Sequence, residues 1–431
     1  MNIARAFKTL SIISISLVLF SAFVSGCEEN RAIGTFDYFR VMWNSDAATA
    51  ATIGFSTAAT PANDTKLYYD AADHGKDISK YAYSQALDSS NTKLNINSSF
   101  VRLKNLKPST KYYFVVADAK TVGPRLWFET SSDRPQDRLS LIMGGDSRNN
   151  RVPRQNANLL VAKLNAHGVM FGGDMVATTT SETEWRGWFE DWQVTISPDG
   201  RMTPVIMTRG NHEVDAEVMS KFFDTPNGTF YGVDINRTLL RVYTLNTEIS
   251  MGGTQAEWLN TDLGVHTGTI WKFAQYHRPM RPHTKSKADG NDQYKYWAGA
   301  FHKYGVDLVV ESDSHTVKST WPLRPDTGTG SVEGFVRDDA TGTVYIGEGC
   351  WGAPLRAADD AKAWTRDVPA DGKAFNHLNW AFIDEKKVEV RTVKVDNAAS
   401  VGTLDDRTRF TLPSGIDIWK PTNGDVITLT H

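Results

Sequence analysis

The pattern of apolar and polar positions changes once along the chain, near residue 135. Before this point, short apolar runs alternate with polar turns, and no stretch has a convincing helical spacing. We expect strands at residues 41–43, 51–55, 66–69 and 112–116, among others. Roughly seven short strands in a segment of this length are typical of a β-sandwich. The pattern therefore predicts a β-sandwich over residues 40–130, followed by a linker at residues 131–136.

After residue 136, apolar runs alternate with stretches of helical spacing. The expected strands are residues 139–144, 168–171, 204–207, 271–276, 306–310 and 343–346, and two clear helices are residues 155–166 and 182–192. Strands that alternate with helices predict a fold in which sheets and helices form separate layers. We therefore expect a layered α/β domain over residues 137–431.

The first 26 residues have the features of a secretory signal. Arg5 and Lys8 precede an apolar run at residues 10–24, and small residues follow it. The run has about 15 residues, whereas a membrane-spanning helix needs about 20. The pattern therefore predicts a cleaved signal.

The end of this segment, Val24-Ser25-Gly26-Cys27, resembles a bacterial lipobox. The resemblance implies cleavage before Cys27 and attachment of lipid to its sulfur. We accordingly expect a lipoprotein signal peptide at residues 1–26, a tether at residues 27–39 and a membrane anchor at Cys27. The protein would then lie in the bacterial cell envelope, on the periplasmic or cell-surface side. An ordinary signal with an incidental cysteine is the alternative.

The charge balance and the cysteine count narrow the function classes further. The chain has 47 Lys and Arg against 50 Asp and Glu, a net charge of −3, and no long basic run, so nucleic acid is not expected as a specific partner. Hydrophobic residues make up 40%, as in an ordinary globular protein. With Cys27 lipidated, Cys350 is the only other cysteine, which excludes an internal disulfide framework.

Five expected strands of the second domain end in residues that can bind metal ions. These residues are Asp146, Asp174, Asn211 with His212, His277, and Asp313 with His315. A glycine precedes each of the first three groups, and glycine lets the backbone and an ion approach closely at a tight turn. Because ligands gather beyond the carboxyl ends of parallel strands, we expect the five ends to form one site.

The types of ligand indicate the chemistry of this site. Carboxylates, an amide oxygen and imidazoles, without thiolates, suit Zn²⁺, Mn²⁺ or Fe. A carboxylate can bridge two cations, and such pairs serve phosphatases and nucleases by neutralising phosphoryl oxygens and generating hydroxide near neutral pH. A neighbouring histidine that binds no metal can donate a proton to the leaving oxygen.

The order of these groups resembles the calcineurin-like metallophosphoesterases: Gly-Asp, Gly-Asp, Gly-Asn-His-Glu, His and a final loop with paired ligands. Residues 103–113 are similar to a fibronectin type III pattern, in which a proline turn enters a strand through a buried tyrosine. This pairing of domains points to the purple acid phosphatases within the superfamily. The resemblance covers nearly all of the chain from about residue 35. It implies a fibronectin III-like β-sandwich followed by an α/β layered metallophosphoesterase domain, itself a β-sandwich flanked by helices.

The resemblance also implies the roles of the metal ligands. Two metal ions, of the kinds Zn, Mn or Fe, would be bound. The ligands would be Asp146 and His315 for the first metal, Asn211, His277 and Asp313 for the second, and Asp174 as the bridge between them.

Three further residues would act on the substrate. His212 would be the catalytic proton donor or would orient the substrate. Arg148, two residues after Asp146, could bind a phosphoryl group with its fork of N–H donors. His283 lies in a loop that we expect near the mouth of the site, although its spacing from His277 differs from that of the family's substrate-facing histidines.

Two positions depart from the purple enzymes. Those enzymes have a tyrosine three residues after the bridging aspartate, and its phenolate binds Fe(III); here the residue is Ala177. Their final loop reads Gly-His-x-His, whereas this chain has Ser312-Asp313-Ser314-His315. One negative ligand is therefore lost from the first metal and one is gained by the second. We expect a colourless site with less preference for Fe(III).

The expected function is that of a secreted, lipid-anchored, metal-dependent phosphoric ester hydrolase that resembles acid phosphatases. A metal-bound hydroxide would attack phosphorus while His212 assists the leaving group, with phosphate monoesters as the favoured small-molecule substrates. A phosphodiesterase or nucleotidase using the same site is one alternative. A non-catalytic surface binding protein on a degenerate phosphatase fold is another, motivated by Ala177 and Asp313. In a third, the β-domain binds a glycan or a partner while the α/β domain does the chemistry.

Overall fold

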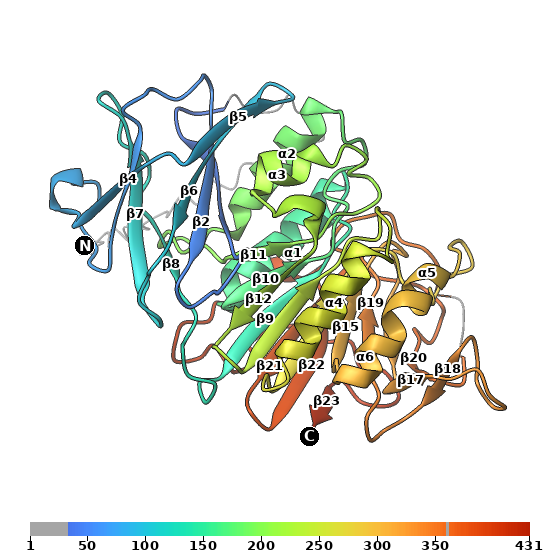
Figure 1. Cartoon of the computed structure of the whole chain (residues 1–431). Coiled ribbons are helices and arrows are strands. Elements are labelled where there is room, and N and C mark those ends of the chain that lie inside the picture. Colours follow the sequence, from blue (N-terminus) through green and yellow to red (C-terminus); the bar gives the residue numbers. More distant parts are fainter. Residues whose placement is uncertain (1–32, 359–361) are drawn as a thin grey trace, which may run out of the picture. The chain divides into compact units, whose positions relative to one another are not determined.

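Two antiparallel sheets packed face to face form the N-terminal part of the chain (Figure 1). The computed structural model describes residues 33–358 and 362–431. One sheet contains β1 (Asp37–Met42), β2 (Ala51–Thr57), β6 (Ile96–Leu103) and β5 (Ser89–Lys93), and the other contains β4 (Tyr83–Ala86), β3 (Lys66–Asp70), β7 (Lys111–Ala117) and β8 (Leu126–Glu129). Phe55 of the first sheet and Phe114 of the second belong to one buried core, which confirms the expected β-sandwich.

Tyr112 ties the turn before β7 to the strand, as the fibronectin-like pattern predicts. Its ring is buried, and its hydroxyl accepts a hydrogen bond of 2.8 Å from the backbone N–H of Lys107. This bond satisfies a donor of the turn that contains Pro108, at a place where the buried ring covers the backbone.

The first sheet of the sandwich continues into the second domain. The shared ten-stranded sheet runs in the order β23-β22-β21-β9-β10-β11-β1-β2-β6-β5. Its further members are β9 (Leu139–Gly144), β10 (Gly168–Phe171), β11 (Val205–Met207), β21 (His377–Ile383), β22 (Lys387–Lys394) and β23 (Ile427–Thr430). Met42 of β1 pairs in parallel with Val205 of β11, so the two predicted domains share one sheet. The expected boundary residues between them stay predictions.

A seven-stranded sheet packs against the second-domain part of the first sheet. Its order is β12 (Tyr231–Ile235), β13 (Leu240–Thr244), β14 (Trp271–Gln275), β15 (Leu308–Glu311), β19 (Val344–Gly347), β16 (Lys318–Thr320) and β20 (Thr365–Asp367). A small hairpin of β17 (Leu323–Pro325) and β18 (Phe335–Arg337) follows β16 in the chain. Met143 and Ile206 from the first sheet share a core with Phe273 and Val310 from the second. The second domain is therefore a β-sandwich as well.

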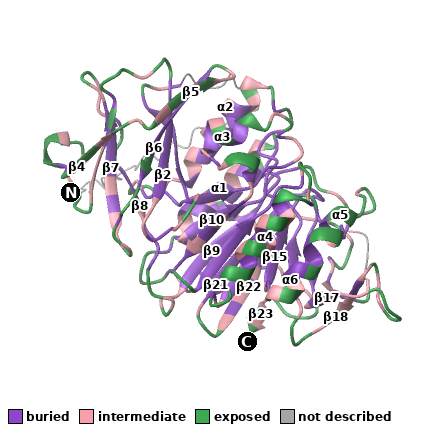
Figure 2. Ribbon diagram, in the orientation of Figure 1, coloured by how far each residue is buried: buried purple, intermediate pink, exposed green. Residues whose placement is uncertain are grey.

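Helices cover both outer faces of this sandwich. They are α1 (Arg151–Leu164), α2 (Glu182–Trp192), α3 (Glu217–Phe223), α4 (Thr254–Val265), α5 (Asn291–Gln293) and α6 (Gly299–Tyr304), with short helical turns η1 (Ile78–Lys80), η2 (Gln193–Thr195), η3 (Asn227–Thr229), η4 (Tyr294–Ala298) and η5 (Ala398–Ser400). Along β9, Met143 faces the opposite sheet while Ile142 belongs to the core beneath α1 and α2. Because strand side chains alternate between faces, a strand covered on both sides must be apolar throughout. Figure 2 shows these central strands as buried and parts of α4 and α6 as exposed.

All six strands and both helices that the second half of the sequence predicts are present. The largest difference is at α1, which begins at Arg151 rather than at residue 155. Pro153 lies in the first turn of this helix, where a missing N–H costs nothing. The helix can therefore begin before the proline. Within the described residues, no helix has the length and apolar character needed to cross a bilayer. The predicted signal peptide and Cys27 lie outside the described residues.

Arg40 connects the N-terminal sheet to the helices of the second domain. Its side chain is fully buried and donates hydrogen bonds to the carbonyl oxygens of Phe222 at 2.5 Å and Tyr38 at 2.7 Å, and to the Ser98 hydroxyl at 3.0 Å. The guanidinium carbon lies 4.8 Å from the ring centre of Phe189. Phe222 belongs to α3 and Phe189 to α2, so one side chain links three elements.

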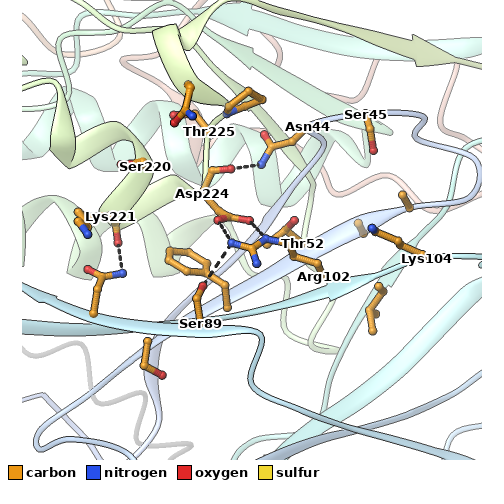
Figure 3. A pocket seen from close by; sticks show the side chains of 18 residues that line it. Asn44, Ser45, Thr52, Ser89, Arg102, Lys104, Ser220, Lys221, Asp224 and Thr225 are labelled. Carbon is orange, nitrogen blue, oxygen red and sulfur yellow. Dashed lines mark hydrogen bonds and ion pairs between the residues drawn. The ribbon is translucent and has the colours of Figure 1, made fainter.

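A second arginine makes a more open link nearby. Arg102 of β6 forms a two-armed ion pair with the carboxylate of Asp224, directly after α3, with an Nε–Oδ2 distance of 2.7 Å (Figure 3). The pair lies in a cleft of about 570 Å³ whose other lining residues include Asn44, Ser89 and Lys221. The predicted metal ligands do not line this cleft.

Replacing Arg40 by methionine should destabilise the protein more than the same change at Arg102. Arg40→Met leaves buried carbonyl oxygens without donors, and we expect a loss of about 2–4 kcal/mol of unfolding free energy. Arg102 is 41% exposed, and its pair should contribute less than about 1 kcal/mol. Thermal unfolding of both variants measures the difference, and equal losses would contradict this account of the domain contact.

Candidate metal centre

The predicted metal ligands follow parallel strands of the two facing sheets. In the first sheet, Asp146 follows β9, Asp174 follows β10 and Asn211 follows β11. In the second sheet, His277 follows β14, and Asp313 and His315 follow β15. The loops from the two sheets meet, since the backbone N–H of Asp313 donates to Oδ2 of Asp146 at 2.8 Å.

Three of these residues form a compact buried cluster. Ligand atoms of Asp146, Asp174 and His277 all lie within 4.8 Å of one another. Nε2 of His277 is 3.3 Å from Oδ1 of Asp174. His315 approaches from the other side, with Nε2 at 3.2 Å from Oδ1 of Asp146.

The other two predicted ligands lie beside His277. Its Nε2 is 3.0 Å from Oδ1 of Asn211 and 3.6 Å from Oδ1 of Asp313. The six side chains therefore form two groups, one around Asp146 with His315 and one around His277, with Asp174 close to His277. This grouping resembles the two expected metal positions, although the ligand roles themselves stay predictions.

The two histidines are oriented for binding a cation. Nδ1 of His277 donates to the carbonyl oxygen of Gly172 at 2.8 Å, and Nδ1 of His315 donates to that of Pro354 at 2.8 Å. A carbonyl oxygen can only accept, so each neutral ring carries its proton on Nδ1 and directs the Nε2 lone pair toward the carboxylates. Burial opposes a charge on His277, but Asp174 and Asp146 outweigh it and raise its pKa well above the usual value.

Buried polar atoms in this cluster lack hydrogen bonds. Among the described residues, Oδ1 of Asp146 and Nε2 of His315 have no hydrogen-bond partner, and Oδ2 of Asp174 has only its ion pair with Nη2 of Arg148 at 2.9 Å. Leaving carboxylate oxygens buried in this way is costly unless a positive charge compensates them. A bound cation would satisfy the atoms of Asp146 and His315, so the residues fit the metal that the sequence predicts.

The loops that carry the predicted ligands have unusual backbone conformations. Asp146 and Asp174 have φ values of 58° and 56°, a region that residues other than glycine seldom adopt. Asp313 and His315 share this conformation, at 66° and 53°. Such strain is concentrated at functional sites. A Cβ atom on Gly173 would lie 2.5 Å from the backbone nitrogen of Gly210, so the tight loops require glycine there.

Glu213 supports the loops of the site without being a predicted ligand. Its fully buried carboxylate accepts hydrogen bonds from the N–H groups of Asp174 at 2.8 Å, Met175 at 2.9 Å and Gly210 at 2.9 Å. Burial and the neighbouring Asp174 raise its pKa to about 7, against the effect of these donors. The Gly-Asn-His-Glu motif contained this residue, but only the fold shows that it holds two strand ends together.

His212 is held beside the cluster by two contacts. Its N–H donates to Oδ1 of Asp174 at 2.8 Å, and its ring Nδ1 lies 2.5 Å from the carbonyl oxygen of Ala177. The residue is partly exposed, unlike the buried histidines at positions 277 and 315. Ala177, which stands where purple enzymes have their tyrosine, therefore contributes a backbone contact to the predicted proton donor.

The two predicted substrate-binding residues have different surroundings. Arg148 lies at the cluster, with Nη2 at 2.9 Å from Oδ2 of Asp174. His283 is completely buried, its ring is stacked on Trp364 at 5.8 Å, and its backbone N–H donates to Glu348 at 2.9 Å. This interior position differs from the place at the mouth of the site that the sequence suggested. The position of His283 in its loop, six residues after His277, does not show that its ring packs into the interior.

Two cations near Asp313 were not among the predicted site residues. The ammonium group of Lys287 forms an ion pair with Oδ1 of Asp313. Arg356 donates from Nη1 to the backbone carbonyl of Asp313 at 2.8 Å. Both come from loops far from residue 313 in the sequence, and no motif marks them.

Comparisons with known proteins agree with this architecture. Residues 37–132 match the family described as Purple acid Phosphatase, N-terminal domain, and residues 148–317 match the family described as Calcineurin-like phosphoesterase. No curated protein matches the chain by sequence.

Two solved structures are similar in fold. One is the purple acid phosphatase PPD1 from yellow lupin (Lupinus luteus) seeds, with 13% identity, a TM-score of 0.68, and coverage of 92% of this chain and 74% of that one. The other is PhoD, with 11% identity, a TM-score of 0.61 and coverage of 92% of both chains. At these identities the likeness shows the fold alone.

Glu213→Gln should impair the metal centre. The amide would place an N–H group against backbone donors, so we expect metal affinity to fall by about 10–100-fold, as for other residues that hold ligands in place. Elemental analysis after dialysis against limiting Mn²⁺ measures this loss. Glu217→Gln is the control, since Glu217 is 66% exposed on α3. Metal retention equal to that of the control would show that Glu213 does not position the ligands.

Proposed function

Because the chain joins a purple acid phosphatase N-terminal domain to a calcineurin-like phosphoesterase domain, we propose that it is a metal-dependent phosphoesterase that favours phosphate monoesters. The observation that carries the proposal is the buried cluster of Asp146, Asp174 and His277, in which Oδ1 of Asp146 has no hydrogen bond among the described residues. Carboxylate and imidazole ligands suit Zn, Mn or Fe ions.

The proposed ligands divide between two cation positions. Asp146 and His315 would serve the first, Asn211, His277 and Asp313 the second, and Asp174 both. When bound, the cations would neutralise phosphoryl oxygens and make water nucleophilic near neutral pH. The distances from His277 to Asp174, Asn211 and Asp313 support this division.

His212 is the residue that we propose gives a proton to the leaving oxygen. Its Nδ1 contact with the Ala177 carbonyl requires an N–H on that nitrogen, so Nε2 is free to release a proton when the ring is charged. The hydrogen bond from the backbone N–H of His212 to Asp174 keeps the ring beside the proposed cation positions. The partial exposure of the residue gives a substrate access to it.

Arg148 is the proposed contact to a phosphoryl oxygen. Its Nη2 is already paired with Asp174, and its Nε has no hydrogen-bond partner among the described residues. A guanidinium group offers several donors in one plane, so it can keep the aspartate and also bind an oxygen of the substrate. The buried ring of His283 has no part in this proposal.

The protein loaded with Mn²⁺ or Zn²⁺ should hydrolyse phosphate monoesters faster than diesters. Asp174→Asn should lower kcat/KM by about 10²–10³-fold or more, since it removes the bridging charge. His212→Ala should slow alkyl esters more than nitrophenyl esters, because a good leaving group needs no proton. Asp371→Asn, an exposed position, is the control.

A panel of mono- and diesters measures these rates. No turnover of any ester by fully loaded protein would overturn the proposal and favour a binding protein on a phosphatase fold. Diesters as the better substrates would leave the site in place but overturn the proposed preference.

We also propose that the protein is anchored to a bacterial membrane through lipid on Cys27, with the enzyme on the periplasmic or cell-surface side. The lipobox-like end of the signal segment supports this proposal. Cys27→Ala should abolish labelling by a fatty-acid analogue and move the protein from the membrane pellet to the soluble fraction. Cys350→Ala is the matched control, because Cys350 is buried in the folded domain. A Cys27→Ala protein that stays labelled in the pellet would contradict the anchor.

A further inference from the structure

Asp313 carries a cation supplied by the protein itself. The ammonium group of Lys287 binds Oδ1 of Asp313, and the same oxygen lies 3.6 Å from Nε2 of His277. The side chain of Asp313 is 4% exposed and that of Lys287 is 22% exposed. The carboxylate of the pair is therefore buried beside a proposed ligand of the second metal, while the lysine is partly exposed.

The backbone around Asp313 is held from two sides. Its N–H donates to Asp146 at 2.8 Å, and its carbonyl oxygen accepts from Arg356 at 2.8 Å. The positive φ of 66° adds a conformation that is seldom adopted. The backbone of Asp313 cannot move away from the site without losing these contacts, so its carboxylate stays at the second position whether or not Lys287 is bound.

The charges of the two proposed positions are therefore unequal. The predicted ligands include three carboxylates, on Asp146, Asp174 and Asp313. Lys287 compensates Asp313, and Arg148 compensates Asp174 at 2.9 Å. Asp146 has no lysine or arginine partner among the ion pairs of the described residues; its Oδ1 lies 3.2 Å from Nε2 of His315, and its Oδ2 accepts from the Asp313 N–H. A cation entering the second position must share Asp313 with an ammonium group that repels it.

Other carboxylates near Lys287 could bind its ammonium group. Lys287 and Asp313 both line a cleft of about 360 Å³, together with Asp289 and Asp292. These carboxylates offer an alternative partner to an ammonium group that leaves Asp313. The arrangement suits exchange between lysine and metal rather than a permanent block.

We propose that Lys287 acts as a built-in cation at the second metal position, so that the first metal binds tightly and the second binds only in competition with this lysine. The inference rests on the proposed metal centre, but its test measures metal binding and does not depend on turnover. It also changes the charge balance expected from the motif, since the negative charge gained at Asp313 is offset by Lys287.

Titration of the metal-free full chain with Mn²⁺ tests this inference. Calorimetry should give one tight and one weak site per chain, and the spin-coupled electron paramagnetic resonance signal of a Mn²⁺ pair should appear only at the weak step. In Lys287→Met the second site should tighten by about tenfold or more, since a like charge is removed from its shared ligand. The first site should change by less than about threefold, being farther from the removed charge.

Three variants separate this role from general effects of charge and folding. Lys386→Met removes an exposed lysine and should leave both affinities unchanged. Lys287→Arg keeps the charge and should keep the second site weak. In the Asp313→Asn background, Lys287→Met should have a smaller effect, because the shared carboxylate is gone.

The outcomes distinguish this inference from the proposed function. An unchanged second site in Lys287→Met, or two equally tight sites in the unmodified protein, overturns the role of Lys287 and leaves the metal centre standing. Absence of Mn²⁺ and Zn²⁺ binding in every protein overturns the metal centre and the inference with it.

Discussion

The site depends on the burial of carboxylates at the ends of apolar strands. Asp146 and Asp174 are fully buried, and among the described residues Oδ1 of Asp146 has no hydrogen bond while Oδ2 of Asp174 has only an ion pair with Arg148. Their negative charges are costly in the interior unless cations compensate them. The surroundings supply part of that compensation through Arg148, which lies 2.9 Å from Asp174, and leave the rest for a metal. The buried carboxylates that are costly for folding are therefore the same groups that would bind the metal.

The two sheets bring these carboxylates together with the imidazoles. The first sheet supplies Asp146, Asp174 and Asn211, and the second supplies His277, Asp313 and His315. Apolar packing between the sheets sets the distance between the two sets of strand ends. Glu213 then joins two loops of the first sheet through backbone N–H groups. Loss of that packing would separate ligands that are more than 100 positions apart in the chain, such as Asp146 and His277.

Much of this architecture could be predicted because its signals are local. Strands buried on both faces are apolar throughout, so they can be found from the sequence. A Gly-Asp pair directly after such a strand predicts an acidic side chain at the strand end, and the structure has one there. The carboxyl ends of parallel strands of one sheet meet by topology, so Asp146 and Asp174, which follow the paired strands β9 and β10, could be expected to be neighbours.

The parts that could not be predicted depend on contacts between distant segments. Lys287 and Arg356 reach Asp313 from other loops, and His283 turns inward onto Trp364. The parallel pairing of β1 with β11, which makes one sheet of two domains, also has no local signal. The local sequence pattern predicts where a strand ends and which residue follows it. It does not predict which side chain of another loop will contact that residue.

The two departures from the purple enzymes now have a common physical setting. Ala177 stands where the purple enzymes have their tyrosine, and its carbonyl oxygen contacts His212. Asp313, a proposed ligand of the second position, forms an ion pair with Lys287. On the proposed division of ligands, the two positions would differ in charge more than the ligand types alone suggest.

Anomalous diffraction from crystals of the full chain grown with Mn²⁺ tests the central claim most directly. We expect an anomalous peak within bonding distance of Asp146, Asp174 and His315, with a weaker peak or none at the position beside Asp313 at low Mn²⁺ concentration. Crystals in which these side chains bind no Mn²⁺ at any concentration would contradict it.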